Sequence, residues 1–323
     1  MARVGFLGSP EPAAYCLRAL VDAGHDVVLA VTRPDTRRSR GSTTSPTPVK
    51  RLATELGIPV SERVADVLEV GADLGVVVAF GRLVRPAVLD RLLMVNLHFS
   101  LLPRWRGAAP VERAILAGDE STGVCLMKLE EGLDTGPVYA RVSTAINPKE
   151  TSAALRHRLT LLGSDLLVER LAGGVGTLGE PVAQEGQVTY AAKLTTEDLH
   201  IDWSQPAVEV ERLIRVGRAW TTFRSGRLIV WDATVRTTPP DGGPAMPAPA
   251  EDGRVTPEPA EDGRVTPGST EDGRVRPGTL VDGCVATGAG WLQLESVQLD
   301  GRKRQPASDW LRGARPQSGE AFA

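Results

Sequence analysis

The chain has 323 residues, of which 41 % are hydrophobic and 24 % charged, so it is long enough for two globular domains with ordinary cores. Its formal net charge of -3 excludes a globally basic surface, so an anionic partner has to meet local clusters of basic residues. No apolar run approaches the roughly 18 residues of a membrane-spanning helix, and the start of the chain lacks the apolar core of a signal peptide. We therefore expect a cytoplasmic monomer with no membrane partner.

Strand-like and helix-like segments alternate through the first two thirds of the chain. Apolar, β-branched runs predict strands at residues 3–8, 26–32, 74–81 and 95–100. Helical spacing predicts helices at residues 13–24, 47–57, 86–94 and 151–174. Runs of Val, Ile and Leu without alternation are typical of strands buried on both faces. The pattern therefore predicts an α/β domain with a mostly parallel sheet over residues 1–203.

The pattern of hydrophobic residues changes after about Asp202. One more helix is followed by short alternating strands, which predicts a small β-barrel or sheet domain over residues 204–323. A tract at about 237–278 interrupts it, with "EDGRVTP" starting at Glu251 and Glu261 and "EDGRVRP" at Glu271. This tract is rich in Pro, Gly, Asp and Glu, so we predict a disordered or floppy insertion.

Four strand ends are candidates for the walls of a site, because ligands of such sheets bind beyond the carboxyl ends of the strands. They are Gly8–Pro10, Thr32–Pro34, Phe80–Gly81 and Asn96–Pro103. The first of them lacks the G-x-G-x-x-G pattern of a dinucleotide loop, which excludes a nicotinamide cofactor. The sequence therefore predicts a cleft at one edge of the sheet for some other ligand.

Asn96 and His98 lie two residues apart in a predicted strand, so their side chains point to the same face. An amide can hold a carbonyl oxygen, and an imidazole can move a proton or stabilise negative charge. The alternative is a hydrogen-bonded structural histidine. Asp134 lies in the turn "GLDTG"; it is either an ordinary turn residue or a carboxylate that orients His98 and favours its charged form. Together the three would supply the parts of an acyl-transfer site.

Covalent and metal-assisted routes find no support in the sequence. There is no G-x-S-x-G motif, and Cys125 lies in the apolar segment "GVCLM", so we interpret it as a core residue. Cys16, Cys125 and Cys284 are far apart and show no ligand spacing, so we expect no metal.

Basic residues cluster in three short segments. One holds Arg37, Arg38 and Arg40, one holds Arg302, Lys303 and Arg304, and one holds Arg104 and Arg106 on either side of Trp105. The last pair is either a solvated surface or a binder of carboxylate or phosphate. Three basic loops on an acidic protein indicate a local anionic partner such as RNA.

With these residues in view, the chain resembles the methionyl-tRNA formyltransferase family almost from end to end. The resemblance rests on "FLGSPEPA", on "VNLHFSLLPRWRGAAPVERAILAGDESTGVCLMKLEEGLDTGPV" and on "VQLDGRKRQPASDWLRG". It implies a Rossmann-like formyltransferase domain followed by an OB-like β-barrel domain. It also implies 10-formyltetrahydrofolate as the formyl donor and initiator methionyl-tRNA as the acceptor.

The resemblance assigns roles to matching positions. It implies that Asn96, His98 and Asp134 are catalytic and that the arginine-rich loop at 37–40 and the turn at 302–304 meet the tRNA. The residues that it implies for folate are Phe80, Gly81, Ser100, Leu101, Leu102 and Pro103. Two other readings remain: a formyltransferase for a sugar nucleotide or another small amine, and a non-catalytic RNA-binding protein. A short junction at "IRVGRAWTTFRSGRL" and the repeat tract keep the first of them open.

Overall fold

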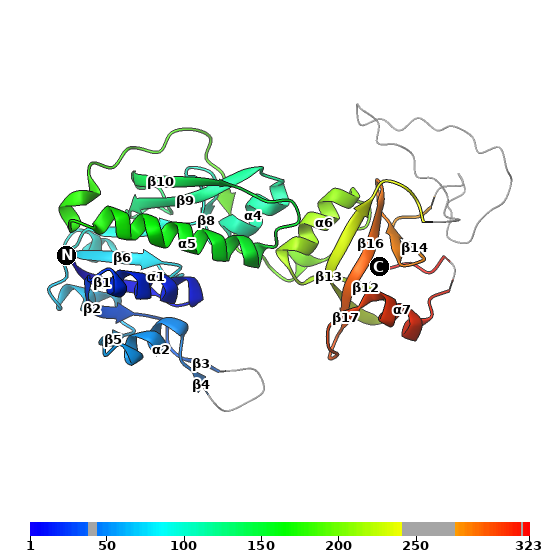
Figure 1. Ribbon diagram of the computed structural model, residues 1–323, viewed down its shortest axis with the longest axis horizontal. Coiled ribbons are helices and arrows are strands. Elements are labelled where there is room, and N and C mark those ends of the chain that lie inside the picture. Colours follow the sequence, from blue (N-terminus) through cyan, green and yellow to red (C-terminus); the bar gives the residue numbers. More distant parts are fainter. Residues whose placement is uncertain (38–43, 241–274, 318) are drawn as a thin grey trace. The chain divides into compact units, whose positions relative to one another are not determined.

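The computed structural model describes residues 1–37, 44–240, 275–317 and 319–323 (Figure 1). The chain divides into two compact units, Met1–Lys193 and Leu194–Ala323. We expected the division after residue 203. Ile201 and Trp203 instead pack in the core of the second unit, and the Ile201 N–H donates to the Trp220 carbonyl at 2.8 Å, so the segment before them belongs there too. Most of the repeat tract lies outside the described residues.

The first unit is built on one seven-stranded sheet with the order β10-β9-β7-β6-β1-β2-β5. The strands β7, β6, β1, β2 and β5 run parallel, whereas β9 and β10 are antiparallel to their neighbours. This is the mostly parallel sheet that the sequence predicts. The strands are β1 (Arg3–Gly8), β2 (Asp26–Val31), β5 (Val60–Ser61), β6 (Leu74–Val78), β7 (Met94–His98), β9 (Ser121–Lys128) and β10 (Val138–Ala145).

Helices cover both faces of this sheet. On one face α1 (Glu11–Asp22) packs against α5 (Ser152–Leu171) and α2 (Pro48–Glu55), as Figure 1 shows. The other face carries an apolar cluster that includes residues of the 3-10 helix η1 (Val64–Leu68) and of α3 (Pro86–Leu89). Smaller elements complete the unit: β3 (Thr36–Arg37) paired with β4 (Thr44–Ser45), β8 (Arg106–Gly107) paired with β11 (Tyr190–Ala191), α4 (Pro110–Ala117) and η2 (Val175–Leu178).

The packing of α5 decides which face of β7 is free for chemistry. Gly163 brings α5 close to the sheet, because a Cβ added there would lie 2.8 Å from Cδ2 of Leu97. Leu97 therefore faces α5. Side chains alternate along a strand, so Asn96 and His98 point to the opposite face. The amphipathic packing of one helix thus directs both polar side chains away from the α1–α5 layer.

The second unit is a small antiparallel sheet with helices at its ends. Its elements are η3 (Glu197–Leu199), α6 (Ala207–Val216), β12 (Ala219–Phe223), β13 (Gly226–Arg236), β14 (Leu280–Val281), β15 (Cys284–Ala286), β16 (Trp291–Leu299), β17 (Gln305–Pro306) and α7 (Ala307–Ala314). The strand order β12-β13-β16-β15-β14 leaves β12 and β14 at the edges. Ala323 exchanges two backbone hydrogen bonds with Thr222 of β12, and Glu320 accepts from Leu280 of β14. The last residues therefore join the two edges, which closes the sheet into the small barrel that the sequence predicts.

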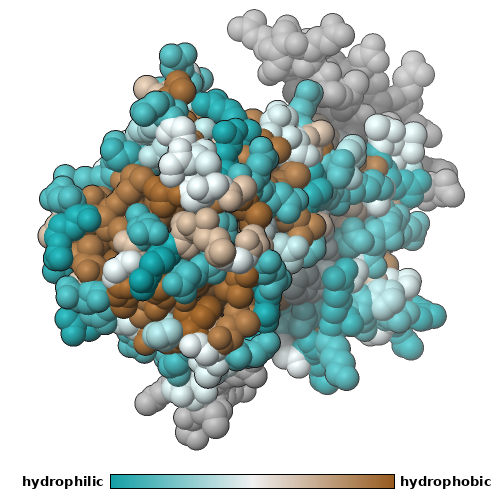
Figure 2. Space-filling view, turned by 60° about the vertical axis from the view of Figure 1, so that its left-hand side comes forward, coloured by the Kyte–Doolittle hydropathy of each residue, from teal (hydrophilic) through white to brown (hydrophobic). Residues whose placement is uncertain are grey.

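The surface of the first unit mixes apolar and polar side chains. On the face that Figure 2 turns forward, brown hydrophobic patches are separated by teal hydrophilic residues. Across the described part of the chain, no helix is long and apolar enough to cross a membrane.

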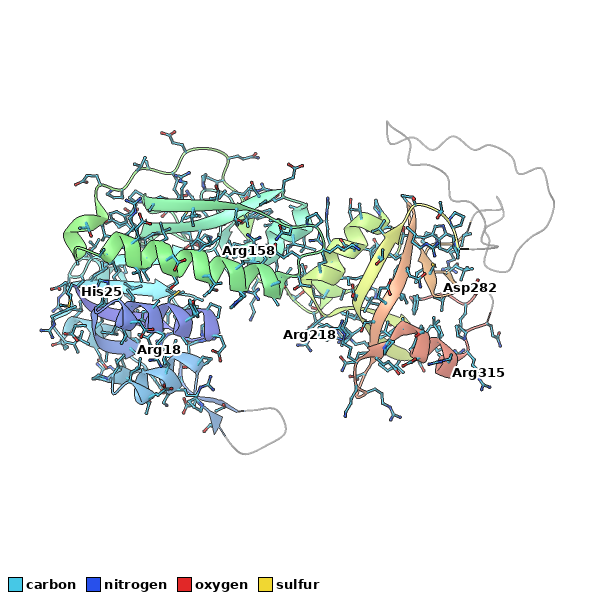
Figure 3. All side chains as sticks on the ribbon, in the orientation of Figure 1. Arg18, His25, Arg158, Arg218, Asp282 and Arg315 are labelled. Atoms are coloured by element: carbon cyan, nitrogen blue, oxygen red, sulfur yellow. The ribbon has the colours of Figure 1, made fainter. Side chains whose placement is uncertain are left out.

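His25 is buried at the start of β2, at the end of the sheet away from the strands' carboxyl ends (Figure 3). Its Nδ1 accepts a hydrogen bond from the Ala2 N–H at 3.3 Å, which requires an unprotonated Nδ1. Burial lowers the pKa of His25 below its ordinary value. The unfolded chain therefore takes up this proton at a higher pH than the folded one.

We predict that the free energy of unfolding falls as the pH is lowered from above about 6.5, where unfolded histidine titrates, because protonation of His25 costs the folded state its Ala2 contact. Urea unfolding at pH 7.5 and 5.5 measures this. His25→Gln should reduce the difference between the two pH values. His157→Gln, which removes an exposed histidine of α5, should not change it. An equal pH effect in wild type and His25→Gln would show that the prediction is wrong.

Candidate active site

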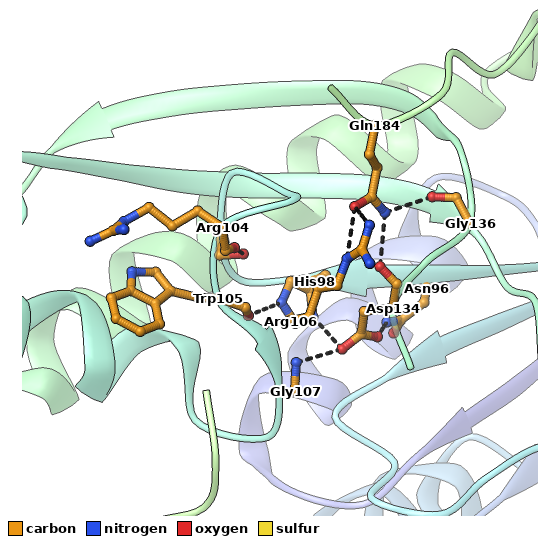
Figure 4. Close-up of polar contacts among 10 residues, drawn as sticks. Asn96, His98, Arg104, Trp105, Arg106, Gly107, Asp134, Gly136 and Gln184 are labelled. Atoms are coloured by element: carbon orange, nitrogen blue, oxygen red, sulfur yellow. Dashed lines mark hydrogen bonds and ion pairs between the residues drawn. The ribbon is translucent and has the colours of Figure 1, made fainter. Parts of the chain in front are cut away.

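Three polar side chains from distant parts of the sequence meet at the carboxyl end of β7. Asn96 and His98 come from the strand itself, and Asp134 comes from the turn between β9 and β10 (Figure 4). His98 is buried, and the side chains of His98 and Asp134 are 6 % and 11 % exposed. The structure therefore brings together the three residues that the sequence predicts as catalytic.

These residues line a cavity of about 460 Å³ beyond the ends of β6 and β7. Its volume is in the range of pockets that take up small-molecule ligands. Phe80 and Gly81, which the sequence predicts as ligand contacts, also lie in its wall. The walls are mixed: apolar side chains such as Leu83 and Val84 face the same space as the three polar residues.

The imidazole of His98 is held at both ring nitrogens. Its Nε2 lies 2.9 Å from the carbonyl oxygen of Trp105, and its Nδ1 lies 3.6 Å from Oδ2 of Asp134. A carbonyl oxygen only accepts, so Nε2 carries a proton. The carboxylate of Asp134 stands beside Nδ1. At 3.6 Å this contact is too long for a hydrogen bond, which leaves Nδ1 available to a third partner.

Both oxygens of Asp134 have donors. Oδ1 accepts from Nδ2 of Asn96 at 3.3 Å, and Oδ2 accepts from the Gly107 N–H at 2.8 Å. The Asn96 amide keeps a second N–H beyond the one it gives to Asp134. Asp134 itself has a φ of 50°, in the left-handed region that a residue other than glycine adopts only when its surroundings hold it there.

Gln184 holds the Asp134 turn in place, and the sequence analysis missed it. Its Nε2 donates to the carbonyl oxygens of Asp134 and Gly136, both at 2.8 Å. Its Oε1 accepts from Nε and Nη2 of Arg106, at 3.1 and 2.7 Å. One amide therefore ties the loop after β7 to the loop after β9, as Figure 4 shows. A lone glutamine in a coil gives no signal in the sequence that would have revealed this contact.

We predict that Gln184→Ala lowers kcat about tenfold or more, because buried groups that lose their hydrogen bonds cost about 1–3 kcal/mol and the Asp134 turn loses two donors. Steady-state kinetics of acyl transfer measure the effect. Gln293→Ala is the matched control: this glutamine also accepts from two strands, from Arg236 of β13 and Cys284 of β15, but in the second unit. A Gln184→Ala enzyme with the kcat of Gln293→Ala would contradict the role given to Gln184.

The segment Ser100–Pro103, predicted to contact the ligand, does not line the cavity. The Ser100 hydroxyl donates to the Arg104 carbonyl at 2.5 Å, and Leu102 packs with Cys125, Met127 and Val138. This segment therefore has a supporting role, because it shapes the turn that places the Trp105 carbonyl beside His98. The strand ends Gly8–Pro10 and Thr32–Pro34 also lie outside the cavity wall.

The two arginines that flank Trp105 both brace the loop. Arg104 forms two hydrogen bonds with Asp119, at 2.8 and 2.5 Å, and its guanidinium lies 4.4 Å from the centre of the Trp105 ring. Hydrogen bonding to Asp119 raises the pKa of Arg104 above its ordinary value. Arg106 is held by Gln184. Neither arginine lines the cavity.

The predicted basic contacts are only partly described by the structure. The backbone of Arg37 belongs to β3, and Arg38 and Arg40 lie outside the described residues. Arg302, Lys303 and Arg304 are exposed in the turn between β16 and β17. Arg304 lies over the ring of Trp231 at 5.5 Å and donates to the Ser296 hydroxyl.

The thiols take no part in this site. All three cysteines are buried, as expected for Cys16 and Cys125. Burial raises the pKa of Cys125 and raises that of Cys16 to about 12, so neither forms the nucleophilic thiolate. Among the residues described, no group of His, Cys, Asp and Glu could hold a metal ion.

The arrangement suits stabilisation of a carbonyl oxygen as it becomes negative. Among the described residues, no hydrogen bond engages Nδ1 of His98 or the second N–H of Asn96, and both side chains line the cavity. Fixed donors around a developing oxyanion are a large source of rate enhancement in acyl transfer.

Residues 2–171 match the formyl transferase family, and residues 193–315 match the formyl transferase C-terminal domain. The chain is 46 % identical to the methionyl-tRNA formyltransferase of Ruegeria pomeroyi over 70 % of its length and 79 % of the relative's. It is 39 % identical to that of Symbiobacterium thermophilum over 100 % of its length and 96 % of the relative's. The protein of this name from Parafrankia sp. is 40 % identical over 99 % of this chain and its own whole length.

Solved structures show the same fold at low identity. An N-formyltransferase from Helicobacter canadensis, in complex with folinic acid and dTDP-3-aminofucose, gives a TM-score of 0.59 at 18 % identity, over 73 % of this chain and 89 % of its own. HypX from Aquifex aeolicus in complex with tetrahydrofolic acid gives 0.54 at 15 % identity, over 96 % of this chain and 47 % of its own. At these identities the likeness extends to the fold alone.

Proposed function

Because this chain belongs to the methionyl-tRNA formyltransferase family, we propose that it moves a formyl group from 10-formyltetrahydrofolate to the amino group of initiator methionyl-tRNA at the cavity of Asn96, His98 and Asp134. The observation that carries this proposal is the pair of unused polar groups, Nδ1 of His98 and one N–H of Asn96, in the wall of one cavity.

The cavity fits a flat heteroaromatic donor. Phe80, Leu83 and Val84 give it apolar walls, and polar groups stand at the end formed by β7. Sites for such ligands combine apolar walls with a few well-placed polar groups. We assign Phe80 and Gly81 to the folate wall. Ser100, Leu101, Leu102 and Pro103 do not line the cavity, and we assign them the support of the loop that carries the Trp105 carbonyl.

The chemistry follows from the donors. The methionyl amino group attacks the formyl carbon, a carbon–nitrogen bond forms, and the bond from that carbon to the folate nitrogen breaks. Negative charge collects on the formyl oxygen, where His98 Nδ1–H and the Asn96 amide donate. The amine gives up one proton and the departing nitrogen takes one up, so the step balances. Asp134 contacts both His98 and Asn96, and we assign the proton relay to it.

The acceptor is a tRNA rather than a small amine in this proposal. The relatives that share 37–46 % identity carry the name methionyl-tRNA formyltransferase, whereas the neighbour solved with an amino sugar nucleotide is 18 % identical. Exposed Arg302, Lys303 and Arg304 offer cations to the phosphates of an RNA backbone, and Arg37, Arg38 and Arg40 are the other predicted contacts.

We predict that His98→Ala lowers kcat for formylation of methionyl-tRNA by about a hundredfold to a thousandfold, the usual cost of losing one oxyanion donor. Asn96→Ala should lower it by a similar factor. Single-turnover formylation with 10-formyltetrahydrofolate measures both variants. His157→Ala, on the surface of α5, is the control and should keep wild-type turnover.

The same assay distinguishes between the two candidate acceptors. Wild type should formylate methionyl-tRNA and leave dTDP-3-aminofucose unmodified under equal conditions. Turnover of the amino sugar nucleotide in preference to methionyl-tRNA would contradict the proposed acceptor, and near-normal turnover in His98→Ala would contradict the proposed site.

A further inference from the structure

The partner of His98 Nε2 is a backbone carbonyl, which no side-chain substitution removes. That carbonyl belongs to Trp105, whose φ of 63° lies in the left-handed region. A bulky residue adopts this conformation only where contacts with neighbouring groups stabilise it, and most of these contacts have to come from outside the peptide itself. The orientation of His98 therefore depends on what fixes the Trp105 peptide.

Asp119 fixes the side chain of Trp105 by hydrogen bonds. Its Oδ2 accepts from the indole Nε1–H at 2.8 Å and from Nε of Arg104 at 2.8 Å, and its Oδ1 accepts from Nη2 of Arg104. The Arg104 guanidinium in turn covers the indole ring. One carboxylate, 13 % exposed, thus holds two consecutive side chains of the loop. Asp119 is itself anchored just after α4, where its N–H donates to the Ala114 carbonyl at 3.0 Å.

The two peptides that flank Trp105 are held as well. In the peptide before it, the Trp105 N–H donates to the Thr189 hydroxyl at 2.8 Å and the Arg104 carbonyl accepts from Ser100. In the peptide after it, which contains the Trp105 carbonyl, the Arg106 N–H donates to the Thr189 carbonyl at 2.9 Å. Asp119 holds the side chain between these two peptides, so that Trp105 keeps its left-handed conformation and its carbonyl keeps one direction.

We propose that Asp119 is a positioning residue: through the Trp105 indole and Arg104 it holds the Trp105 carbonyl against Nε2 of His98, so that Nδ1–H points to the substrate oxygen. Asp119 does not line the cavity. Its catalytic consequence rests on the proposed formyl transfer, whereas its effect on the His98 ring does not.

The test combines kinetics with the proton signal of one imidazole. The chain has four histidines, so 15N-histidine labelling of the full-length protein gives few signals, and His98→Gln identifies the Nε2–H of His98 by its loss. In wild type this proton should be protected from solvent exchange by its carbonyl partner. In Asp119→Asn it should exchange fast, and kcat should fall by about a hundredfold, the cost of a small misplacement of a catalytic group, with KM for both substrates unchanged. Trp105→Phe, which removes the indole N–H together with one ring of the indole, should show the same two effects.

The control removes a similar ion pair elsewhere in the first unit. Glu150 forms two hydrogen bonds with Arg158 of α5, labelled in Figure 3, at 3.0 and 2.7 Å, and does not line the cavity. Glu150→Gln should keep both the protected proton and kcat. A protected Nε2–H in Asp119→Asn, or equal losses in Asp119→Asn and Glu150→Gln, would overturn the positioning role. A wild type that keeps the protected proton but does not formylate methionyl-tRNA would overturn the proposed function and leave the positioning role standing.

Discussion

The imidazole of His98 lies between two acceptors, the carbonyl oxygen of Trp105 and the carboxylate of Asp134. The first partner settles which nitrogen carries the hydrogen bond to the protein, and the second stands beside the other nitrogen without a hydrogen bond to it. The result is a buried imidazole with one ring nitrogen left free at a cavity wall. Most other contacts of the site serve to keep these two acceptors where they are.

Each acceptor has its own support. The Trp105 carbonyl depends on the loop that Ser100, Asp119 and Thr189 hold, and the Asp134 turn depends on Gln184 and on the Gly107 N–H. Both Trp105 and Asp134 have a positive φ, so both loops hold conformations that cost energy. The sheet supplies a rigid base for this arrangement, because α5 packs on Leu97 and directs Asn96 and His98 to the other face.

Local patterns were sufficient to predict the layout of the fold and the face of β7 on which Asn96 and His98 meet. Alternation along a strand placed Asn96 and His98 on one face, and buried apolar runs predicted the parallel sheet. The roles of Asp119 and Gln184 had no such signal, because each depends on a contact between segments that are distant in the sequence, and one of the partners is a backbone carbonyl. The place of Ile201 and Trp203 in the second core had no signal for the same reason. They pack with strands that follow later in the chain, and this packing shifts the domain boundary.

A double-mutant cycle on His98 and Asp134 tests the central claim most directly, because the claim is that the carboxylate acts through the imidazole. Single-turnover formylation of methionyl-tRNA would be compared for wild type, His98→Ala, Asp134→Ala and the double variant. We predict that the double variant is about as slow as the slower single variant, as for residues that act as one unit. Losses that multiply, so that each residue contributes its full factor independently of the other, would contradict the account.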